Sequence, residues 1–585
     1  MLVSHLFLIL LCSHIGSKNF TTFFLIANTR LSFMGNSLRR SSDYNSNEEA
    51  RSLPIDTIFQ LPSPMPSWPS GGDFASGEID LGGLQVRQVS SFNKVWTAYE
   101  GGPDNLGATV FEPSNVPDGF SMFGCYAQQN NQPLFGWVLV GKDDSGDILK
   151  KPTDYTLVWT SESLKISQTT QAYFWLPTPP DGYVAVGIVV TTSSDKPSLD
   201  KIRCVRTDFS EECETDNWIW AQGTVRSDNG VNLYGLRPQN RGTQAQALSV
   251  GTFTVQDNDS SLSLSCLKNN NFPSSSMPNL KQIEALFEAY SPFIYFHPRE
   301  TYLPSSVNWY FSNGALLYTK GEESNPVPIE PNGSNLPQGG SNDGTYWLDL
   351  PVDENAKEKI RKGDLASSEV YLHVKPMFGS TFTDIAMWIF YPFNGHSTAK
   401  LGLVDISLGH IGEHVGDWEH LTLRISNFDG VLYKVYFSEH SGGAWVDTSM
   451  AEFHTNNKIV AYSALNGHPF YYKPGLVLQG GDDIGLRDDT EKSDIFMDTA
   501  GGFSIVAAEN LVPAVVEPPW LNYGREWGPK TQTKAGDEVN RLENLLSGNL
   551  RSAFERVVNL LPNEVYEEEG PLGPKMKSSW NGDER

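Results

Sequence analysis

Short apolar runs separated by Gly, Asp, Asn and Pro fill the chain from residue 61 to residue 267. The runs at 134–141 and 155–159 are examples, since each has the length of one strand and has turn-forming residues on both sides. No stretch of this region has the 3.6-residue period of a long helix. The pattern predicts an N-terminal all-β domain, prism-like or a sandwich, at residues 61–267.

This domain contains two copies of a short sequence pattern. The sequence Pro-Asp-Gly-Phe at 117–120 is followed by Gly124, and Pro-Asp-Gly-Tyr at 180–183 is followed by Gly187 at the same spacing. Pro before Asp-Gly is typical of a tight turn, after which the aromatic residue starts a strand and the closing Gly permits close packing. We expect a repeated turn–strand module, with a ligand-binding repeat as the alternative.

A different pattern starts after a linker at residues 268–278 and predicts a second domain at residues 279–535. Ile283, Leu286 and Tyr290 belong to an apolar stripe with helical spacing. Strands are expected after it at 293–296, 370–374, 386–391, 421–425 and 433–437, with a Gly-, Asn- and Pro-rich loop at 320–345. The fold class is therefore mainly β, and the second domain is expected to be a β-sandwich with helices at its margins.

The two ends of the chain read differently from its body. Residues 1–60 are expected to be an N-terminal extension, a signal or a disordered lead-in, in which 1–33 are either a secretory signal without the usual basic start or an addition upstream of the true start. In the second case Gly35 is a candidate myristoylation site. Residues 536–585 are expected to form a helical segment, periodic over 539–561, followed by a solvated acidic tail.

Composition narrows the functional classes. The net charge of −26 argues against a nucleic-acid-binding protein, because phosphate recognition needs a basic surface. With 52 Gly, 36 Pro and 12% aromatic residues, the composition is typical of β domains. Five widely spaced cysteines allow one bridge, such as Cys204 to Cys213, although isolated buried thiols are the favoured interpretation.

The densest group of ionisable side chains lies at residues 409–420, where three histidines and three carboxylates share twelve residues. If a strand starts at Asp417, its alternation places Asp417 and Glu419 on one face and His420 on the other. Two carboxylates on one face, joined by His414 from the preceding turn, are suited to a divalent cation.

Oxygen ligands favour Ca²⁺ or Mg²⁺, and Asp405, at the end of a short strand nearby, is a further candidate metal ligand. Additional imidazoles would favour Zn²⁺ or Mn²⁺ instead. The alternative is a set of loop charges satisfied by backbone amides and Arg424. Because two uncompensated carboxylates on one face repel each other, we favour a metal or ligand site.

Other histidines stand beside Gly where strands are expected to end. Side chains on such loops can reach a common pocket, so His440 and His468 are predicted to share a ligand pocket with His414. His396 and His410 are further candidates for this pocket, and a surface or capping role is the alternative for each one alone. The histidines interpreted as structural are His297, His373 and His454.

No nucleophile elbow, P-loop or dinucleotide-binding glycine motif is present in the sequence. Catalysis could still use a metal-bound water, with Glu419 or His414 as the base. We therefore keep a metal-dependent hydrolase as an alternative to a protein without enzymatic activity.

Many short motifs resemble the plant branch of the vacuolar protein sorting-associated protein 62 family. They include Phe-Asn-Lys-Val-Trp at 92–96, Glu-Gly-Gly-Pro-Asp at 100–104, Leu-Phe-Gly-Trp at 134–137, Tyr-Pro-Phe-Asn-Gly at 391–395, Gly-Asp-Trp-Glu-His at 416–420, Ser-Glu-His at 438–440, Trp-Gly-Pro at 527–529 and Gly-Pro-Leu-Gly-Pro-Lys at 570–575. The resemblance covers residues 55–585. It implies a link to vacuolar delivery, for a family branch described only as a domain of unknown function.

A remoter similarity concerns the site alone. The spacing His414-x-x-Asp417-Trp-Glu419 is similar to the Gly-His-Arg-His-Asp-Trp-Glu signature of necrosis- and ethylene-inducing peptide-like proteins. Those are β-sandwich proteins that hold a divalent cation and engage membrane glycolipids. The resemblance implies metal ligands at His414, Asp417 and Glu419, with Asp405 as a looser candidate, although Val-Gly at 415–416 replaces the Arg-His pair.

These observations lead to three hypotheses. The first is a non-enzymatic protein that binds lipid or carbohydrate headgroups with the help of a divalent cation. The second is a metal-dependent hydrolase, and the third is a metal-free structural sorting adaptor. The expected location is endomembrane, vacuole-associated or cytoplasmic, with secretory entry if residues 1–33 are a signal. Protein partners stay unknown.

Overall fold

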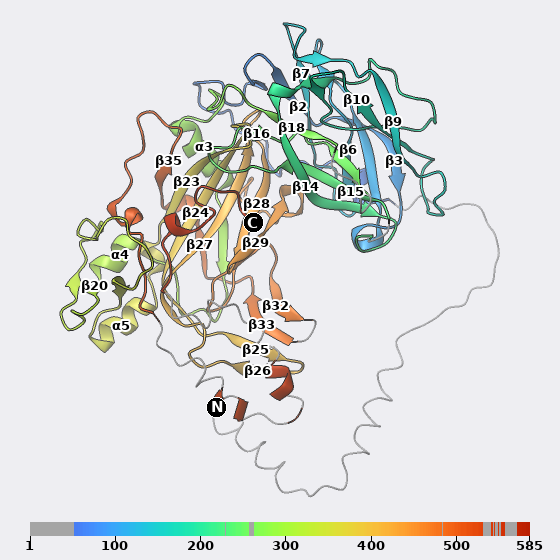
Figure 1. Ribbon diagram of the computed structural model, residues 1–585. Coiled ribbons are helices and arrows are strands. Elements are labelled where there is room, and N and C mark those ends of the chain that lie inside the picture. Colours follow the sequence, from blue (N-terminus) through green and yellow to red (C-terminus); the bar gives the residue numbers. More distant parts are fainter. Residues whose placement is uncertain are drawn as a thin grey trace, which may run out of the picture. The chain divides into compact units, whose positions relative to one another are not determined.

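The computed structural model describes residues 52–227, 230–256, 263–481, 484–530, 540–541, 543–544, 548, 551–555 and 570–585 (Figure 1). The chain from Leu53 to Arg585 forms one compact unit. Gly35 and the candidate signal at 1–33 lie outside the described residues. Most of the predicted helix at 539–561 also lies outside them, although its described residues at 540–541, 543–544 and 551–555 are helical.

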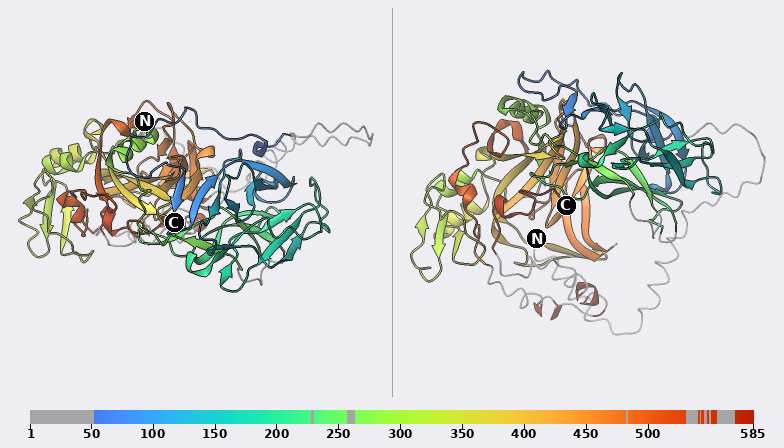
Figure 2. Two further views of the ribbon diagram at one scale, coloured as in Figure 1. Left: turned by 90° about the horizontal axis from the view of Figure 1, so that it is seen from above. Right: turned by 45° about the horizontal axis from the view of Figure 1, so that its top comes forward.

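The protein is mainly β, as predicted, and its strands fall into two groups, coloured from blue to green and from green through yellow to red in Figure 2. Among the described residues, no sheet joins strands of residues 78–268 to strands of residues 293–508. The first group forms five small sheets, ordered β1-β2-β7-β5, β12-β10-β9, β11-β13-β8, β16-β18-β14-β15-β17 and β3-β4-β6.

The strands of the first group are β1 Glu78–Asp80, β2 Gln85–Val89, β3 Phe92–Ala98, β4 Ala108–Pro113, β5 Ser121–Met122, β6 Tyr126–Gln129, β7 Val138–Lys142, β8 Leu149–Lys150, β9 Asp154–Thr160, β10 Tyr173–Thr178, β11 Tyr183–Val184, β12 Val189–Thr191, β13 Cys204–Arg206, β14 Ser210–Ala221, β15 Asn232–Pro238, β16 Ala247–Leu248, β17 Phe253–Gln256 and β18 Ser265–Lys268.

The repeated sequence pattern at 117–124 and 180–187 is also a structural repeat. Gly119 and Gly182 both have φ of +82°, so the two turns share a backbone conformation that favours glycine. The two closing glycines lie against each other, since a Cβ on Gly124 would lie 2.9 Å from the Cα of Gly187. The module therefore repeats in space as well as in sequence, and its glycines allow the two copies to touch.

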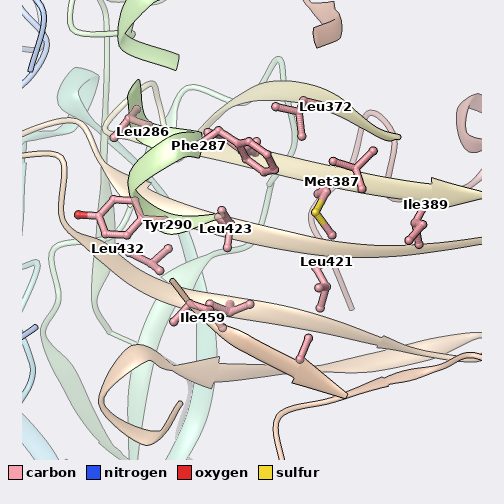
Figure 3. Close-up of a cluster of buried hydrophobic side chains, with 14 of the residues drawn as sticks. Leu286, Phe287, Tyr290, Leu372, Met387, Ile389, Leu421, Leu423, Leu432 and Ile459 are labelled. Atoms are coloured by element: carbon pink, nitrogen blue, oxygen red, sulfur yellow. The ribbon is translucent and has the colours of Figure 1, made fainter. Parts of the chain in front are cut away.

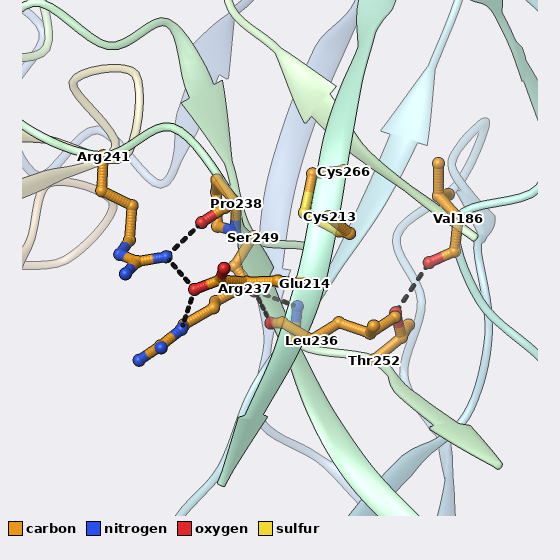
Figure 4. The surroundings of a disulfide bond; sticks show 11 residues. Val186, Cys213, Glu214, Leu236, Arg237, Pro238, Arg241, Ser249, Thr252 and Cys266 are labelled. Atoms are coloured by element: carbon orange, nitrogen blue, oxygen red, sulfur yellow. Dashed lines mark hydrogen bonds and ion pairs between the residues drawn. A yellow bond between two sulfur atoms is a disulfide. The ribbon is translucent and has the colours of Figure 1, made fainter. Parts of the chain in front are cut away.

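The pairing of the cysteines differs from the suggested Cys204–Cys213 bridge. Cys213 on β14 is bonded to Cys266 on β18, a neighbouring strand of the same sheet (Figure 4). Cys125 and Cys204 are buried free thiols, as expected for isolated cysteines. The correct partner is 53 residues away in the sequence, and strand pairing alone brings the two cysteines together.

The second group contains the α-helices α3 to α5 and the strands β19 to β35. The helices are α3 Leu280–Tyr290, α4 Val307–Ser312 and α5 Glu354–Arg361. The strands are β19 Phe293–Phe296, β20 Leu316–Thr319, β21 Val327–Pro328, β22 Tyr346–Asp349, β23 Val370–Met377, β24 Phe382–Asn394, β25 Thr398–Leu401, β26 Val404–Ser407, β27 His414–Ser426, β28 Leu432–Glu439, β29 Gly442–Asp447, β30 Val460–Ser463, β31 Phe470–Tyr471, β32 Gly475–Gly481, β33 Ile484–Thr490, β34 Phe496–Asp498 and β35 Phe503–Ala508.

Helix α3 confirms the predicted apolar stripe. Its start is fixed by a capping box, in which the Asn279 side chain accepts from the Gln282 amide and the Gln282 side chain accepts from the Asn279 amide. Leu286, Phe287 and Tyr290 turn toward the sheet and pack with side chains from β24, β27 and β28 (Figure 3). Burial of each such side chain contributes about 1.5–3 kcal/mol.

The core of this group lies between two sheets, which confirms the predicted sandwich. One sheet has six strands in the order β29-β28-β27-β24-β23-β35, and the other has four in the order β31-β30-β19-β34. Both sheets contribute side chains to the same apolar cluster. Helices α4 and α5 pack on the opposite face of the six-stranded sheet, at the margin of the sandwich.

Strand β27 carries different side chains on its two faces. Leu421, Leu423 and Ile425 point into the sandwich core, and the same alternation places Asp417 and Glu419 at the start of this inner face. The outer face carries Trp418, His420, Thr422 and Arg424 in sequence order. Both faces of one strand therefore bear ionisable groups.

The described part of the predicted solvated acidic tail, residues 570–585, is not solvated throughout, although residues 576–578, 581 and 585 are exposed. Trp580 and Glu584 are each only 4% exposed. Glu584 forms ion pairs with Lys375 and His420, on the outer face of the six-stranded sheet. Basic partners supplied by distant strands bury a segment whose composition alone is typical of a surface.

Candidate functional site

The candidate site begins beside Gly416, where the start of β27 packs closely against the backbone of Trp527. Gly416 has φ of +71°, and a Cβ at this position would lie 2.5 Å from the carbonyl oxygen of Trp527. His414 is the first residue of β27 rather than part of a preceding turn. Its Nδ1 donates to the Gly416 carbonyl at 2.9 Å, which leaves Nε2 with a free lone pair. Burial lowers the pKa of His414, so the ring is neutral at pH 7.

Asp417 and Glu419 lie on one face of β27, as predicted, and both are buried, with exposed fractions of 9% and 7%. Burial and the neighbouring Asp417 raise the pKa of Glu419 to about 8. The Glu419 carboxyl group is hydrogen-bonded to the Ser438 hydroxyl on β28. For Asp417, burial is opposed by the hydrogen bond from His468, and the pKa is lowered. One carboxyl group is therefore protonated beside an ionised one.

His468 holds Asp417 from the side. Its Nδ1 donates to the Asp417 carboxylate at 3.0 Å, and its ring stacks on Tyr391 at a centroid distance of 3.9 Å. The Nε2 atom lies 3.9 Å from the Glu300 carboxylate, which is too long for a hydrogen bond. Although burial opposes it, the carboxylates of Asp417 and Glu300 raise the pKa of His468 to about 9. A buried N–H of a charged ring thus has no hydrogen-bond acceptor.

His440 forms the second histidine–carboxylate pair of the site. Its Nε2 lies 3.0 Å from the Asp488 carboxylate on β33. The same carboxylate accepts from the Tyr471 hydroxyl at 2.7 Å and from the Gln479 amide at 3.3 Å. Burial opposes the charge, but Asp488 raises the pKa of His440 to about 9. His440 also interacts electrostatically with Glu419, which links the two pairs.

Both histidines have an unusual backbone. The φ angle is +56° at His440 and +63° at His468, in the left-handed region that non-glycine residues rarely occupy. Such a conformation costs about 1–3 kcal/mol and persists only where surrounding structure enforces it. Gly467 lies between them in space, since a Cβ there would be 3.8 Å from the His440 ring. The fold therefore holds two imidazoles beside two buried carboxylates at a cost in strain.

The remaining predicted residues are placed elsewhere or contribute little. Asp405 is 49% exposed in its side chain and pairs with Arg487 at 2.7 Å. The His410 side chain is 72% exposed and pairs with Glu413. The carbonyl oxygen of His396 accepts a hydrogen bond from the Asn466 side chain. Within the described residues, no three His, Cys, Asp or Glu side chains are arranged to hold a metal ion.

The histidines interpreted as structural have ordinary packing roles. His454 stacks on Phe293, and His297 accepts a hydrogen bond from the Arg299 amide. His373 stacks on Trp580 and pairs with Glu509. Of the three, His297 contacts the candidate site, through its carbonyl oxygen, which accepts from the Glu300 amide at 2.9 Å.

Sequence reasoning missed several residues of this site. Glu300, Asp488, Tyr471 and Gln479 come from four separate segments, and nothing in their local sequence sets them apart. Ser438 could have been found, because it lies two residues before His440 in a motif already of interest. A serine at the end of a strand that neighbours β27 can reach the Glu419 face.

The arrangement suits a ligand that supplies hydrogen-bond donors or positive charge. Ionised carboxylates only accept hydrogen bonds, whereas the protonated Glu419 carboxyl group and the free Nε2–H of His468 can donate. A divalent cation could replace the proton on Glu419 and neutralise both carboxylates, with the His414 lone pair as a nitrogen ligand. The donor types fit such an ion, but the present positions do not enclose one.

None of the helices in the described part of the chain combines the length and apolarity that a membrane crossing requires.

Several solved structures are similar to part of the chain. GNIP1Aa from Chromobacterium piscinae has 21% identity and a TM-score of 0.27, over 36% of this chain and 40% of that one. NLPPya in complex with glucosamine has 11% identity and a TM-score of 0.20, over 35% of this chain and 70% of that one. Necrosis and Ethylene inducing Protein 2 from the causal agent of cocoa's Witches Broom disease has 12% identity and a TM-score of 0.15, over 31% and 74%. These likenesses are too weak to carry an argument about function.

No curated protein shows a significant match to this chain. The family comparison is far more extensive, because one family model matches residues 55–584, nearly the whole described unit. The matched region includes both groups of strands and every residue of the candidate site. The chain belongs to the vacuolar protein sorting-associated protein 62 family.

Proposed function

We propose that this vacuolar-protein-sorting-like protein binds the sugar headgroup of a glycolipid or glycan at the cluster around Asp417 and Glu419, without enzymatic activity. The observation that carries the proposal is the pair of left-handed histidines, His440 and His468, which present imidazoles to buried carboxylates. Backbone strain of this kind is concentrated at binding and catalytic sites.

The charge of the cluster favours a sugar over a bare phosphate. Glu300, Asp417 and Asp488 offer acceptor oxygens, and sugar hydroxyl groups are hydrogen-bond donors. A phosphate group would meet several carboxylates and would need a cation to offset the repulsion. The buried Nε2–H of His468 could donate to a sugar oxygen.

A divalent cation, Ca²⁺ or Mg²⁺, is a separate part of the proposal. It would be held by Asp417, Glu419 and His414, with Asp405 as a looser candidate, and it would coordinate hydroxyl groups of the ligand. The His414 hydrogen bond to a carbonyl supports this, because metal-binding histidines commonly donate their other ring N–H in this way. The present spacing of the side chains speaks against a ready-made metal site.

The proposed place of action is the surface of an endomembrane. Membership of a vacuolar protein sorting family supports a role in vacuolar delivery. A headgroup-binding site would let the protein associate with such membranes through their glycolipids. Secretory entry depends on residues 1–33, which lie outside the described part of the chain.

The test is co-sedimentation of the purified full chain with phosphatidylcholine vesicles that either contain or lack a neutral glycosphingolipid. We expect sedimentation only with the glycolipid, at least about tenfold weaker binding for the double variant Asp417→Asn/Glu419→Gln, and no change for Asp154→Asn. Asp154 is a matched control because it is a surface carboxylate paired with Lys196 on the first group of strands.

Each arm of this test has a defined meaning. Glycolipid binding that the double variant retains would place the headgroup elsewhere and overturn the proposal. Glycolipid binding that persists in a chelator, but is lost in the double variant, would keep the site and remove the cation from it. No binding to either vesicle would favour a metal-free structural sorting adaptor.

Hydrolysis is a second candidate, and one observation favours it. Asp417 and Glu419 have pKa values shifted in opposite directions, as in sites where one carboxyl group acts as an acid and the other as a base. The vesicle assay can include chromatography of the recovered glycolipid. Release of free sugar that Glu419→Gln abolishes would identify an enzyme, and intact glycolipid would support binding alone.

A further inference from the structure

The segment of residues 579–585 lies in a polar groove on the outer face of the six-stranded sheet, opposite the candidate site. The mark C in Figures 1 and 2 shows its end beside this sheet. Three ionisable side chains, Lys375 on β23, Asp384 on β24 and Arg424 on β27, form the floor of the groove and are almost fully buried. Charges buried in this way need partners, and the segment supplies them.

Glu584 is recognised through both of its carboxylate oxygens. One oxygen accepts from Lys375 Nζ at 3.1 Å and from the Thr422 hydroxyl at 3.0 Å. The other accepts from His420 Nε2 at 3.1 Å. A glutamine would keep the shape but lose the charge, and it would turn a hydrogen-bond donor toward one of these three donors.

Asp583 is recognised in the same manner by two arginines. One of its oxygens accepts from Arg424 at 2.5 Å and the other from Arg241 at 3.0 Å. Arg241 is held in place independently of Asp583, because it also donates to Glu214 and to the Pro238 carbonyl (Figure 4). The groove is thus shaped for an Asp side chain before that side chain arrives.

The groove also fixes the main chain and an aromatic anchor. Lys375 donates to the carbonyls of Ser579 and Gly582, at 3.0 and 3.3 Å. Trp580 is buried and stacks on His373, with ring centroids 3.8 Å apart. Buried aromatic anchors commonly dominate the energy of peptide recognition.

Gly242 and Thr243, from the first group of strands, contact the segment at Asn581. The Thr243 amide donates to the Asn581 carbonyl at 3.0 Å, and a Cβ on Gly242 would lie 2.6 Å from that same oxygen. Residues from the first group of strands therefore meet residues from the six-stranded sheet around one short peptide. The contacts read a Trp, three backbone carbonyls and an acidic pair.

We propose that this groove is a binding site for acidic peptide segments of the pattern Trp-x-x-Asp-Glu, and that residues 580–584 occupy it in cis until a partner protein with such a segment displaces them. Simple coverage of a sheet would not require this chemistry, since buried ion pairs can often be replaced by apolar groups at no loss of stability. Paired charges and fixed hydrogen bonds instead select one ligand among many. The three cations of the groove outnumber the carboxylates of Asp384 and Glu214 that also pair with them, so its net charge favours an acidic partner.

The probe is a labelled peptide with the sequence of residues 578–585, and its binding to the full chain is followed by fluorescence anisotropy. The variant Asp583→Asn/Glu584→Gln loosens the segment in cis and should bind the peptide at least about tenfold more tightly than the unchanged chain. Adding Lys375→Met to this variant should abolish binding. A peptide carrying Asn and Gln at the acidic positions is the matched control and should not bind.

Absence of peptide binding by a variant that melts cooperatively would overturn the proposal. If the variant does not fold, a protease recognition sequence inserted between the exposed residues Lys577 and Ser578 gives a second measurement. After cleavage of the folded chain, the labelled peptide should exchange into the groove, and lack of exchange would show that the segment is a permanent part of the fold. Exchange of segments between copies, seen as a concentration-dependent dimer lost in Lys375→Met, would replace the partner protein by a second copy and overturn that part of the proposal.

Discussion

The two faces of β27 carry ionic clusters that are compensated in different ways. On the inner face, Asp417 and Glu419 are balanced by imidazoles and a proton, and such groups change charge near neutral pH. On the outer face, the acidic residues of segment 579–585 meet Lys375 and Arg424, and the guanidinium of Arg424 keeps its charge at any physiological pH. A single strand thus supports one adjustable cluster and one fixed cluster.

The clusters also differ in how completely their hydrogen bonds are made. Both carboxylate oxygens of Glu584 accept hydrogen bonds, and so do both carboxylate oxygens of Asp583. In contrast, the buried Nε2–H of His468 has no acceptor, and Glu419 shares its surroundings with another carboxylate. The outer cluster already holds a ligand of matching chemistry, whereas the inner cluster has donor and acceptor capacity left for one. Buried polar groups that lack a partner are uncommon and call for an explanation.

The largest expected effect comes from removing a fixed cation. Arg424→Met leaves Asp384 and Asp583 buried without their shared partner, and we expect a loss of about 3–5 kcal/mol in the free energy of unfolding. Urea denaturation measures it. Arg424→Lys, which keeps the charge but not the paired geometry, should cost less. A methionine variant as stable as the unchanged chain would mean that the outer cluster contributes no net pairing energy.

A smaller effect should separate the adjustable cluster from the fixed one through pH. The pKa of Glu419 is raised from about 4.5 to about 8, so the folded chain binds more protons than the unfolded chain between these values. The pKa values of His440 and His468 are raised to about 9, so their stabilising charges are lost as the pH passes through 9. All three groups therefore make stability fall as the pH rises from 6 to 9, on the order of a few kcal/mol.

Urea denaturation in a chelator across this pH range measures the effect. Glu419→Gln should reduce the slope of the profile below pH 8 and leave the histidine contribution, which runs from pH 6.5 to about 9. Glu584→Gln is the control from the other face, because His420 and Lys375, working against burial, hold the pKa of Glu584 below its usual range. This control should lower stability without changing the slope. An unchanged slope in Glu419→Gln would contradict the assignment of a raised pKa to Glu419.

Patterns with short sequence range predicted the elements correctly. The stripe of α3 and the alternation of Asp417 and Glu419 depend only on the periods of a helix and a strand. The repeat that closes at Gly124 and Gly187 depends on turn chemistry, which is also local. The fold class, the sandwich and the carboxylate pair could therefore be predicted from the sequence.

Contacts between residues that are far apart in the sequence could not be predicted. His440 meets Asp488 across 48 residues, and an acidic side chain in an Arg-Asp-Asp sequence reads as solvated until β33 is placed beside it. The segment at 579–585 was expected to be solvated because it is acidic and ends in polar residues. Its partner Lys375 lies in a strand that is otherwise suited to a core. Nothing local indicates that such a lysine is buried to receive a carboxylate.

The smallest expected effect marks where the inner cluster ends. Asp405 was predicted as a looser metal ligand, but its exposed side chain pairs with Arg487, which also has Asp489 as a partner. Asp405→Asn should therefore cost less than about 1 kcal/mol in urea denaturation, because exposed ion pairs contribute little. It should also leave the pH profile of stability and the glycolipid binding unchanged. If Asp405→Asn weakens glycolipid binding as strongly as Asp417→Asn does, the inner cluster extends to β26 and a bound ligand must draw Asp405 away from Arg487.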